Sequence, residues 1–438
     1  MRHPAPLLCA LAMAVCTSFP SASAQAQAST PPTGMQHVAW SKNANIYEVN
    51  IRQFTAEGSF NAFAAQLPRL KKMGVDILWI MPINPIGEKN RKGPLGSYYA
   101  VQNYTTVNPE FGTLEDFKSL VKKAHALGMH LIIDWVPNHT AFDNPWVTEH
   151  PDWYLKNDKG EIYPVTMGNE SWTDVTGLDY SNKALWKGMT DAMAFWLREA
   201  DIDGFRCDVA NNVPTAFWNH ARAELDRIKP VFMLAEGDKP DQHEHAFDMT
   251  YGWDTWELFV KIAKGEADAR SLKDFLAAPP QHFPRDAYRM RFTTNHDKNS
   301  WDGSDKELYG PAFKAMSVLA MTLPGMPLIY DGQESGLDKR LEFFQKDPIE
   351  WKNYQYAPFY AQLLELKHEH PALWNGQYGA EAEVLETGND KVFAFRRQKE
   401  RDVVTVVVNL SGEKQAFTLP GKKRQQLAAW NYRIDARN

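Results

Sequence analysis

The segment GFRCDVA places Arg206 and Asp208 two positions apart among apolar neighbours. In a β-strand, alternate side chains point to the same face, so both charges would lie together while Phe205, Cys207 and Val209 pack on the opposite face. A guanidinium beside a carboxylate favours the ionised form of that carboxylate. The spacing therefore predicts that Asp208 is held ionised and is able to attack a carbon centre.

Further polar residues follow other short apolar runs. Asp134 follows LII, Glu236 follows VFMLA, and His296 and Asp297 follow FTTN. The apolar run before Glu236 predicts a dry environment, which favours the protonated form that a general acid needs. Two carboxyl groups on either side of one bond, one a nucleophile and one an acid, perform retaining glycoside hydrolysis. Asp297, together with His139 and His296, would then contact the sugar hydroxyls.

Two other interpretations stay open at this stage. Each acidic residue taken alone is typical of a turn or cap, and an Arg–Asp pair is typical of a structural ion pair. His139, Asp208, His296 and Asp297 are also potential ligands of a metal-dependent hydrolase. The metal interpretation is the weaker one, because no His-x-His pair closes the first predicted strand.

Short apolar runs alternate with longer segments of helical period, which is the pattern of βα units. Strands are predicted at 45–51, 76–82, 130–136, 202–209, 231–236, 246–251, 288–295 and 326–332. Helices are predicted at 60–73, 114–127, 184–199, 214–228, 255–263, 311–321 and 358–370. This alternation predicts an α/β fold of the (β/α)8 TIM-barrel type, with a doubly wound parallel sheet as the alternative. The carboxyl ends of barrel strands converge on one face, so the polar residues above would meet there.

The predicted units divide the chain into a barrel with two additions. Residues 41–139 and 183–375 form the two parts of the catalytic barrel, and the aromatic-rich segment 140–182 is an insertion after the third strand. Residues 376–438 contain short strand patterns separated by turn residues. They predict a C-terminal antiparallel β-sandwich domain.

The first residues predict export. Residues 1–24 have a basic start, an apolar run and a small-residue exit, which indicate a secretory signal peptide, and a polar leader follows at 25–40. The apolar run is too short for a membrane anchor. We therefore expect a periplasmic or extracellular protein that retains Cys207 alone and has no internal disulfide. The net charge of −6, without any block of Lys and Arg, excludes the electrostatic footprint of a nucleic-acid binder.

Four short segments, in order, resemble the motifs of the α-amylase family, glycoside hydrolase family thirteen. They are DWVPNH (134–139), GFRCDVA (204–210), LAEG (234–237) and TTNHD (293–297). The resemblance covers the chain from about Ile46 to its C-terminus, and it implies a catalytic barrel, a domain B inserted after the third strand and a terminal β domain.

The resemblance also implies roles for individual residues. Asp208 resembles the catalytic nucleophile, Glu236 the general acid/base and Asp297 the transition-state stabiliser. It implies that the reacting sugar is bound by Tyr99, His139, Arg206 and His296. The strand-end residue Asp134 is predicted to belong to the same substrate-binding set. Asn138 resembles an asparagine that binds calcium in many members, and calcium is the one cofactor expected. Asn211 and Asn212 stand where many members have Lys-His, so the contacts to the leaving group differ.

These observations predict an exported enzyme that hydrolyses α-1,4-linked glucans or malto-oligosaccharides with retention, through a covalent glycosyl ester on Asp208. An α-glucan transglycosylase would use the same residues. A non-catalytic glucan-binding or transport-partner protein is a third interpretation, against which stands the presence of all three carboxylates. Aromatic faces would bind further sugars, and the candidates, each also compatible with ordinary packing, are Trp135, Trp172, Trp253 and Trp301.

Overall fold

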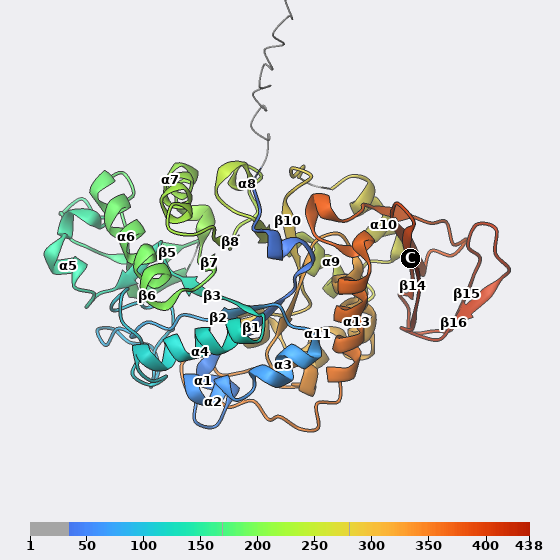
Figure 1. The fold of residues 1–438 in the computed structure, drawn as a ribbon, viewed down its shortest axis with the longest axis horizontal. Coiled ribbons are helices and arrows are strands. Elements are labelled where there is room, and N and C mark those ends of the chain that lie inside the picture. The colour runs from blue at the N-terminus through green and yellow to red at the C-terminus, as the bar shows by residue number, and fades with distance from the viewer. Residues whose placement is uncertain (1–34, 169, 280) are drawn as a thin grey trace, which may run out of the picture. The chain divides into compact units, whose positions relative to one another are not determined.

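Eight short parallel strands close into a barrel in the computed structural model, which describes residues 35–168, 170–279 and 281–438 (Figure 1). In ring order they are β1 (Ile46–Val49), β11 (Met326–Tyr330), β10 (Tyr288–Arg291), β9 (Met249–Tyr251), β8 (Phe232–Ala235), β7 (Gly204–Cys207), β3 (His130–Trp135) and β2 (Ile77–Ile80). The closed ring confirms the TIM barrel and excludes the open doubly wound sheet. All eight strands lie within their predicted segments.

Helices follow most of the barrel strands. They are α1 (Ile51–Phe54), α2 (Phe60–Ala64), α3 (Leu67–Met73), α4 (Leu114–Ala126), α6 (Lys183–Ala200), α7 (Thr215–Asp226), α8 (Gln242–His245), α9 (Trp253–Ala263), α10 (Ala269–Ala277), α11 (Asp305–Tyr309), α12 (Phe313–Thr322) and α13 (Ala357–Glu369). The helix predicted at 60–73 is interrupted between α2 and α3. Among the residues that the structure describes, no helix is long and apolar enough to cross a membrane.

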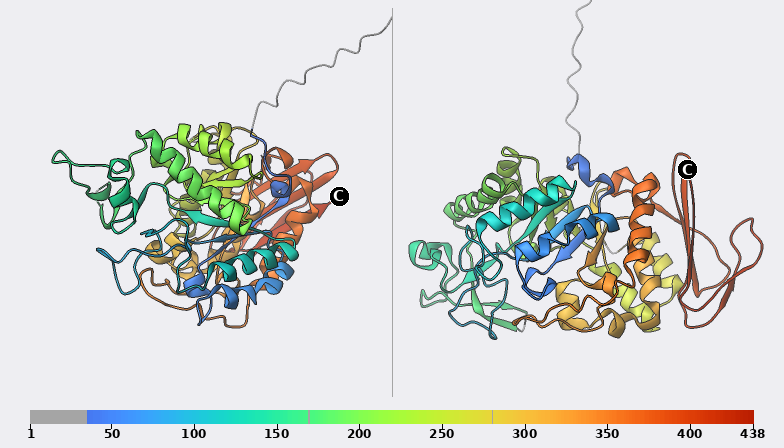
Figure 2. Two further views of the ribbon diagram at one scale, coloured as in Figure 1. Left: turned by 60° about the vertical axis from the view of Figure 1, so that its left-hand side comes forward. Right: turned by 60° about the horizontal axis from the view of Figure 1, so that its bottom comes forward.

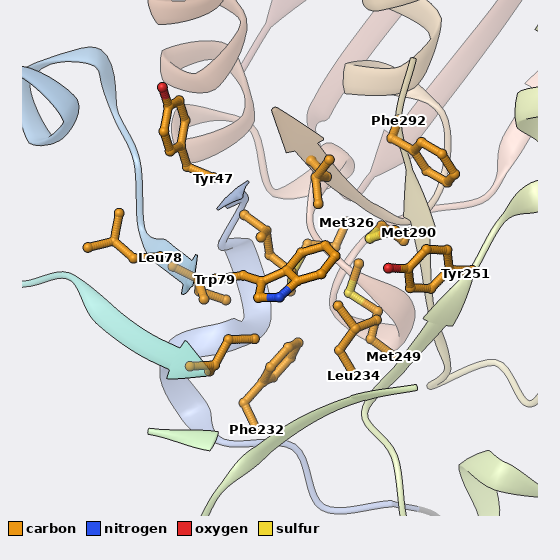
Figure 3. Packing of buried hydrophobic residues seen from close by; sticks show 14 of the residues in the cluster. Tyr47, Leu78, Trp79, Phe232, Leu234, Met249, Tyr251, Met290, Phe292 and Met326 are labelled. Carbon is orange, nitrogen blue, oxygen red and sulfur yellow. The ribbon is translucent and has the colours of Figure 1, made fainter. Parts of the chain in front are cut away.

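The barrel interior is filled by large side chains rather than by solvent. Trp79 of β2 is fully buried and lies among Leu234, Met249 and Met290 in the close view (Figure 3). The strand register also aligns polar groups: Asp134 on β3 is the neighbour of Arg206 on β7. Because paired residues of parallel strands share a face, this register places the two charges together inside the barrel.

A small antiparallel sheet is inserted after β3. It consists of β4 (His139–Ala141), β6 (Glu170–Gly177) and β5 (Pro164–Met167), and α5 (Trp146–Glu149) lies between β4 and β5 in the chain. Its apolar core combines Ala141, Val165 and Val175 with Ile86 and Ala100. The last two residues belong to the long connection after β2, so this connection and the inserted sheet are packed as one unit.

The terminal strands form two antiparallel sheets. One has the order β12 (Ala382–Val384), β13 (Val392–Lys399), β14 (Asp402–Asn409), β17 (Tyr432–Arg437), and the other pairs β15 (Gln415–Phe417) with β16 (Gln425–Leu427). They lie on the side of the barrel away from the inserted sheet in both views of Figure 2. Arg397 of β13 is buried and donates hydrogen bonds to the carbonyl oxygens of Thr322, Trp374 and Ala380. This side chain joins the terminal sheet to the end of α12.

The signal peptide predicted at 1–24 and most of the leader at 25–40 fall outside the described residues. These two assignments stay predictions.

Gly204 begins the strand that carries Arg206, and it has no room for a side chain. Its φ is +152°, and a Cβ atom would stand 1.9 Å from the carbonyl oxygen of Phe232 on β8. We expect Gly204→Ala to lower the free energy of unfolding by about 3 kcal/mol or more, because the clash is with backbone. Urea denaturation measures the change. Gly412→Ala, at an exposed position where a Cβ atom would lie 3.7 Å from Trp430 Nε1, is the control and should be close to neutral.

Candidate active site

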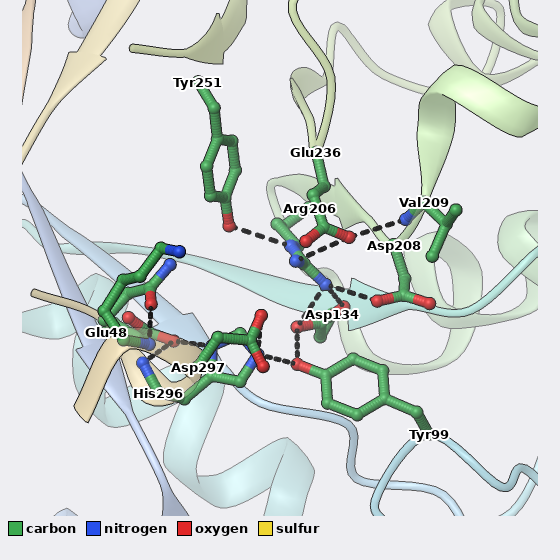
Figure 4. A network of polar contacts seen from close by, with 12 residues as sticks. Glu48, Tyr99, Asp134, Arg206, Asp208, Val209, Glu236, Tyr251, His296 and Asp297 are labelled. Atoms are coloured by element: carbon green, nitrogen blue, oxygen red, sulfur yellow. Dashed lines mark hydrogen bonds and ion pairs between the residues drawn. The ribbon is translucent and has the colours of Figure 1, made fainter. Parts of the chain in front are cut away.

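A single guanidinium lies at the centre of the charged groups (Figure 4). Arg206 is fully buried, and its Nη1 donates to Asp134 Oδ1 at 2.9 Å and to Asp208 Oδ1 at 3.0 Å. Its Nη2 forms an ion pair with Glu236 Oε2 at 3.0 Å, and its Nε donates to the hydroxyl of Tyr251 at 3.2 Å. Three carboxyl groups from different segments therefore share one cation.

Asp208 lies immediately beyond the end of β7, where the backbone turns sharply. Phe205 and Cys207 face away from the barrel interior, as predicted, but Val209 does not continue the strand. Its φ of +45° lies in the left-handed region, which is strained for a β-branched residue. In this conformation the Val209 N–H donates to Glu236 Oε2 at 2.7 Å. The expectation that Val209 packs outward is wrong, because the turn uses its backbone to hold Glu236.

A second cluster lies beside the first. His296 Nε2 is 2.7 Å from the hydroxyl of Tyr99 and 3.4 Å from Asp297 Oδ2. Its Nδ1 is hydrogen-bonded to Glu48 Oε1. The Tyr99 hydroxyl also donates to Asp134 Oδ2 at 3.0 Å. Tyr99 and Asp134 therefore connect His296 and Asp297 to the Arg206 cluster.

The carboxyl groups of the Arg206 cluster do not all ionise easily. Burial and the charges of Glu236, Asp134 and Asp297 raise the pKa of Asp208 well above its usual range, although Arg206 opposes this. Burial also raises the pKa of Asp134 to about 6 against the effect of Arg206. The prediction that the neighbouring Arg206 keeps Asp208 ionised is therefore incomplete, since burial and the other acids oppose the effect of the cation.

The two histidines of the site differ in charge. Burial lowers the pKa of His139 to about 4, so this ring is neutral at pH 7. Burial also lowers the pKa of His296, but the charges of Asp297 and Glu48 outweigh it and raise the pKa to about 9. His296 is therefore an imidazolium, able to donate hydrogen bonds from both ring nitrogens.

A cavity of about 820 Å³ lies over these groups. Six of the predicted site residues line it, namely Tyr99, His139, Asp208, Glu236, His296 and Asp297. Asp134 and Arg206 lie beneath, fully buried. The Glu236 side chain is 17% exposed, so its surroundings are less dry than the preceding apolar run predicts. The structure brings together all eight predicted catalytic and substrate-binding residues, and their individual roles stay predictions.

The tryptophan candidates divide into two pairs. Trp172 and Trp301 line the cavity. Trp135 is fully buried against Phe205, and Trp253 packs on Tyr251. The first pair is placed to meet a ligand, whereas the contacts of the second pair are those of ordinary packing.

Asn138 lies apart from this cavity and borders a separate depression of about 440 Å³. Its amide nitrogen contacts His139 Nδ1 at 3.1 Å. Among the described residues that line this depression, Asp179 is the single carboxylate. Calcium prefers six to eight oxygen ligands, several of them carboxylates, so the donor set fits calcium poorly. Within the described residues, no group of three His, Cys, Asp or Glu side chains has metal-binding geometry.

Several side chains of the site were not identified from the sequence. Glu48 holds His296, and Trp79 donates from Nε1 to Asp134 Oδ2 at 3.2 Å. Tyr251 binds Arg206, and the ring of Phe343 lies nearly parallel to that of Tyr99. Glu48, Trp79 and Tyr251 belong to predicted strands, so a polar or aromatic residue on the inward face was a usable signal. Phe343, in a loop, had none.

Comparisons with known proteins agree with this architecture. The family described as "Alpha amylase, catalytic domain" matches residues 39–257. The crystal structure of an alpha-amylase from Lactobacillus plantarum superposes with a TM-score of 0.82 at 30% identity, covering 91% of this chain and 100% of that one. A maltogenic alpha-amylase from Thermotoga neapolitana gives 0.78 at 30% identity, covering 90% and 96%.

Curated relatives include more than one activity. An alpha-amylase from Haloarcula japonica is 29% identical over 90% of this chain, and an alpha-1,4-glucan:maltose-1-phosphate maltosyltransferase from Picrophilus torridus is 28% identical over 81%. This chain spans 59% of the length of each of these two relatives.

Replacement of Glu48 tests the origin of the charge on His296. Glu48→Gln keeps a hydrogen-bond acceptor for His296 Nδ1 but removes a negative charge that raises the histidine pKa. We expect the pKa of His296 to fall from about 9 toward the ordinary value, as measured by NMR titration of the ring. Glu57→Gln, at an exposed position, is the control. An unchanged titration in Glu48→Gln would show that Glu48 does not stabilise the imidazolium.

The calcium prediction at Asn138 has a direct thermal test. Because a site with one carboxylate binds calcium poorly, we expect the midpoint temperature of thermal unfolding to be the same in EDTA and in millimolar calcium. A ligand that binds the native state raises the midpoint with its concentration. A calcium-dependent rise that Asn138→Ala removes would establish the site against this expectation.

Proposed function

Because the chain belongs to the α-amylase family, we propose that it is a retaining hydrolase of α-1,4-linked glucans or malto-oligosaccharides. The relatives include glycoside hydrolases and transferases, so the chain is an enzyme of this kind. The interpretation as a non-catalytic binding protein is therefore not favoured. The substrate and the reaction outcome are the proposal. The predicted export to the periplasm or beyond is compatible with it.

The observation that carries the proposal is the shared cation. Asp208 and Glu236 bind the two terminal nitrogens of one guanidinium, and both line the same cavity. Retaining hydrolysis needs two carboxyl groups close to one glycosidic bond. A rigid, fully buried Arg206 fixes both groups relative to each other, which supports this requirement directly.

The reaction proceeds in two steps in this proposal. Asp208, in its ionised form, attacks the anomeric carbon, while Glu236 donates a proton to the glycosidic oxygen as the bond breaks. A glycosyl ester on Asp208 results. Glu236, now ionised, takes a proton from a water molecule, which attacks the anomeric carbon and releases the sugar with its original configuration.

The neighbouring groups stabilise the positive charge that develops on the sugar ring and hold its hydroxyls. Asp297 is 38% exposed at the cavity and is placed to accept hydrogen bonds from the ligand. His296, as an imidazolium, is a donor next to it, and neutral His139, which also lines the cavity, offers a further donor. Tyr99 presents an aromatic ring that a pyranose can cover.

Transglycosylation is the second candidate function. It has a specific observation in its favour, namely the relative described as a maltosyltransferase. The two reactions share the glycosyl ester and differ in whether water or a sugar hydroxyl attacks it. Purified protein incubated with maltotriose at low and high concentration separates them: products longer than maltotriose that increase with concentration indicate transfer.

Replacement of either central carboxyl tests the mechanism. We expect Asp208→Asn to abolish turnover, since the amide does not form the ester. Glu236→Gln should reduce kcat by a factor of about 10² to 10⁴, the usual contribution of a general acid. Release of reducing sugar from maltotriose and starch measures both variants, and circular dichroism shows whether they fold.

Asp158→Asn, at an exposed site that does not line the cavity, is the matched control and should keep full activity. Normal sugar release by a folded Asp208→Asn variant would refute the nucleophile assignment.

A further inference from the structure

We propose that one side of the cavity is closed by a continuous wall, defined by Lys92, Asp174, Phe344 and Trp301, so that the enzyme cuts short segments from the non-reducing ends of its glucan. This inference rests on the proposed function and adds to it the mode of attack.

The barrel order fixes which side of the cavity holds the leaving group. Glu236 follows β8 and protonates the departing oxygen, so the leaving part of the chain extends on the β8 side. In the closed ring, β1 lies opposite β8, with β11 and β2 as its neighbours. The loops after β2 and β11 therefore flank the retained, non-reducing part of the substrate, and the loop after β10 adjoins the loop after β11. All four residues of the wall line the cavity, and three of them come from these loops.

An ion pair closes the first section of the wall. Lys92, in the connection after β2, places its Nζ 3.2 Å from Asp174 Oδ1 on β6 of the inserted sheet. Asp174 is only 4% exposed, so its charge depends on a nearby cation for stabilisation. Glu88, in the same connection, donates its N–H to Asp143 Oδ2 at 2.8 Å. The connection is thus held against the inserted sheet at two points.

The second section joins the connection after β2 to the loop after β11. The Leu95 N–H donates to the carbonyl oxygen of Phe344 at 2.9 Å. Gly93 has a φ of +62°, and a Cβ atom there would lie 2.6 Å from the Phe344 Cβ. The two loops therefore touch without space for a side chain between them. A sugar chain has no room to pass at this junction.

The third section joins the loop after β11 to the turn after β10. Ser300 Oγ donates to the Leu341 carbonyl oxygen, and the Leu341 N–H donates to Asn299 Oδ1. The ring of Trp301 lies 6.0 Å from that of Phe344. Trp301 is 54% exposed although its backbone is fixed by a hydrogen bond from Arg340. An exposed aromatic ring at a cavity rim is a face on which a terminal sugar can stack.

On the opposite side, the cavity lining that follows β7 and β8 consists of Asp208, Val209 and Glu236. Lys239, further along the loop after β8, is exposed. A long leaving chain can extend there into solvent. A wall on the retained side together with an opening on the leaving side accommodates a chain end but not the middle of a chain. This asymmetry is the structural basis of the inference.

Two substrates distinguish the modes of attack. One is p-nitrophenyl α-maltoheptaoside, and the other is the same compound with its non-reducing end blocked by an ethylidene acetal. We expect the native protein to cleave the blocked compound at least about tenfold more slowly, since the bulky end meets the wall. Equal rates on the two compounds would overturn the inference. No cleavage of the unblocked compound would instead reject the proposed function.

Variants of the wall complete the experiment. Lys92→Ala should raise the ratio of blocked to unblocked cleavage by about fivefold or more, by opening the wall. The double variant with Lys92→Ala and Asp174→Ala avoids an unpaired buried carboxylate and should give the same increase. Lys187→Ala removes the exposed Lys187–Asp191 pair and should leave the ratio unchanged. A ratio that stays at the native value in both folded wall variants would show that the ion pair does not close the cavity.

Discussion

The burial of the Arg206 guanidinium is the constraint on which the site depends. A cation without access to water is costly unless acids surround it. Asp134, Asp208 and Glu236 fulfil this role from three neighbouring strands, and Tyr251 accepts from the remaining nitrogen. Burial raises the pKa values of Asp208 and Asp134, and for Asp208 the charges of the neighbouring acids add to this effect.

The barrel was predictable because its physical signal is local. A strand buried on both faces is a short apolar run, and the runs around Ile77, Ile132 and Leu328 were sufficient to find their strands. The elements that were missed carry a weaker signal. β17 has no buried residue, so its short alternating YRIDAR sequence does not stand out as a core strand. α10 is short and has only Ala269 and Leu272 buried. Both are stabilised by neighbours that are distant in sequence, which a local pattern does not report.

The site was predictable to the extent that it consists of strand-end residues. Their side chains converge because the strands are parallel, and the four motifs marked the same positions. What escaped prediction depends on contacts across the sequence: Glu48 meets His296 about 250 positions away, and Lys92 meets Asp174 across the inserted sheet. The left-handed turn at Val209 also has no sequence signal, since valine disfavours that conformation. The prediction of an ionised Asp208 was incomplete for the same reason, because only the assembled barrel shows how many acids face Arg206.

The side chain of Arg397 makes the terminal strands inseparable from the barrel. Its donors satisfy carbonyl oxygens of Thr322, Trp374 and Ala380, all of which precede the last sheet in the chain. Truncation before β12 would therefore do more than remove an appendage. It would leave buried backbone carbonyl oxygens in the barrel without hydrogen-bond donors. The last sheet and the end of α12 therefore unfold in one cooperative event.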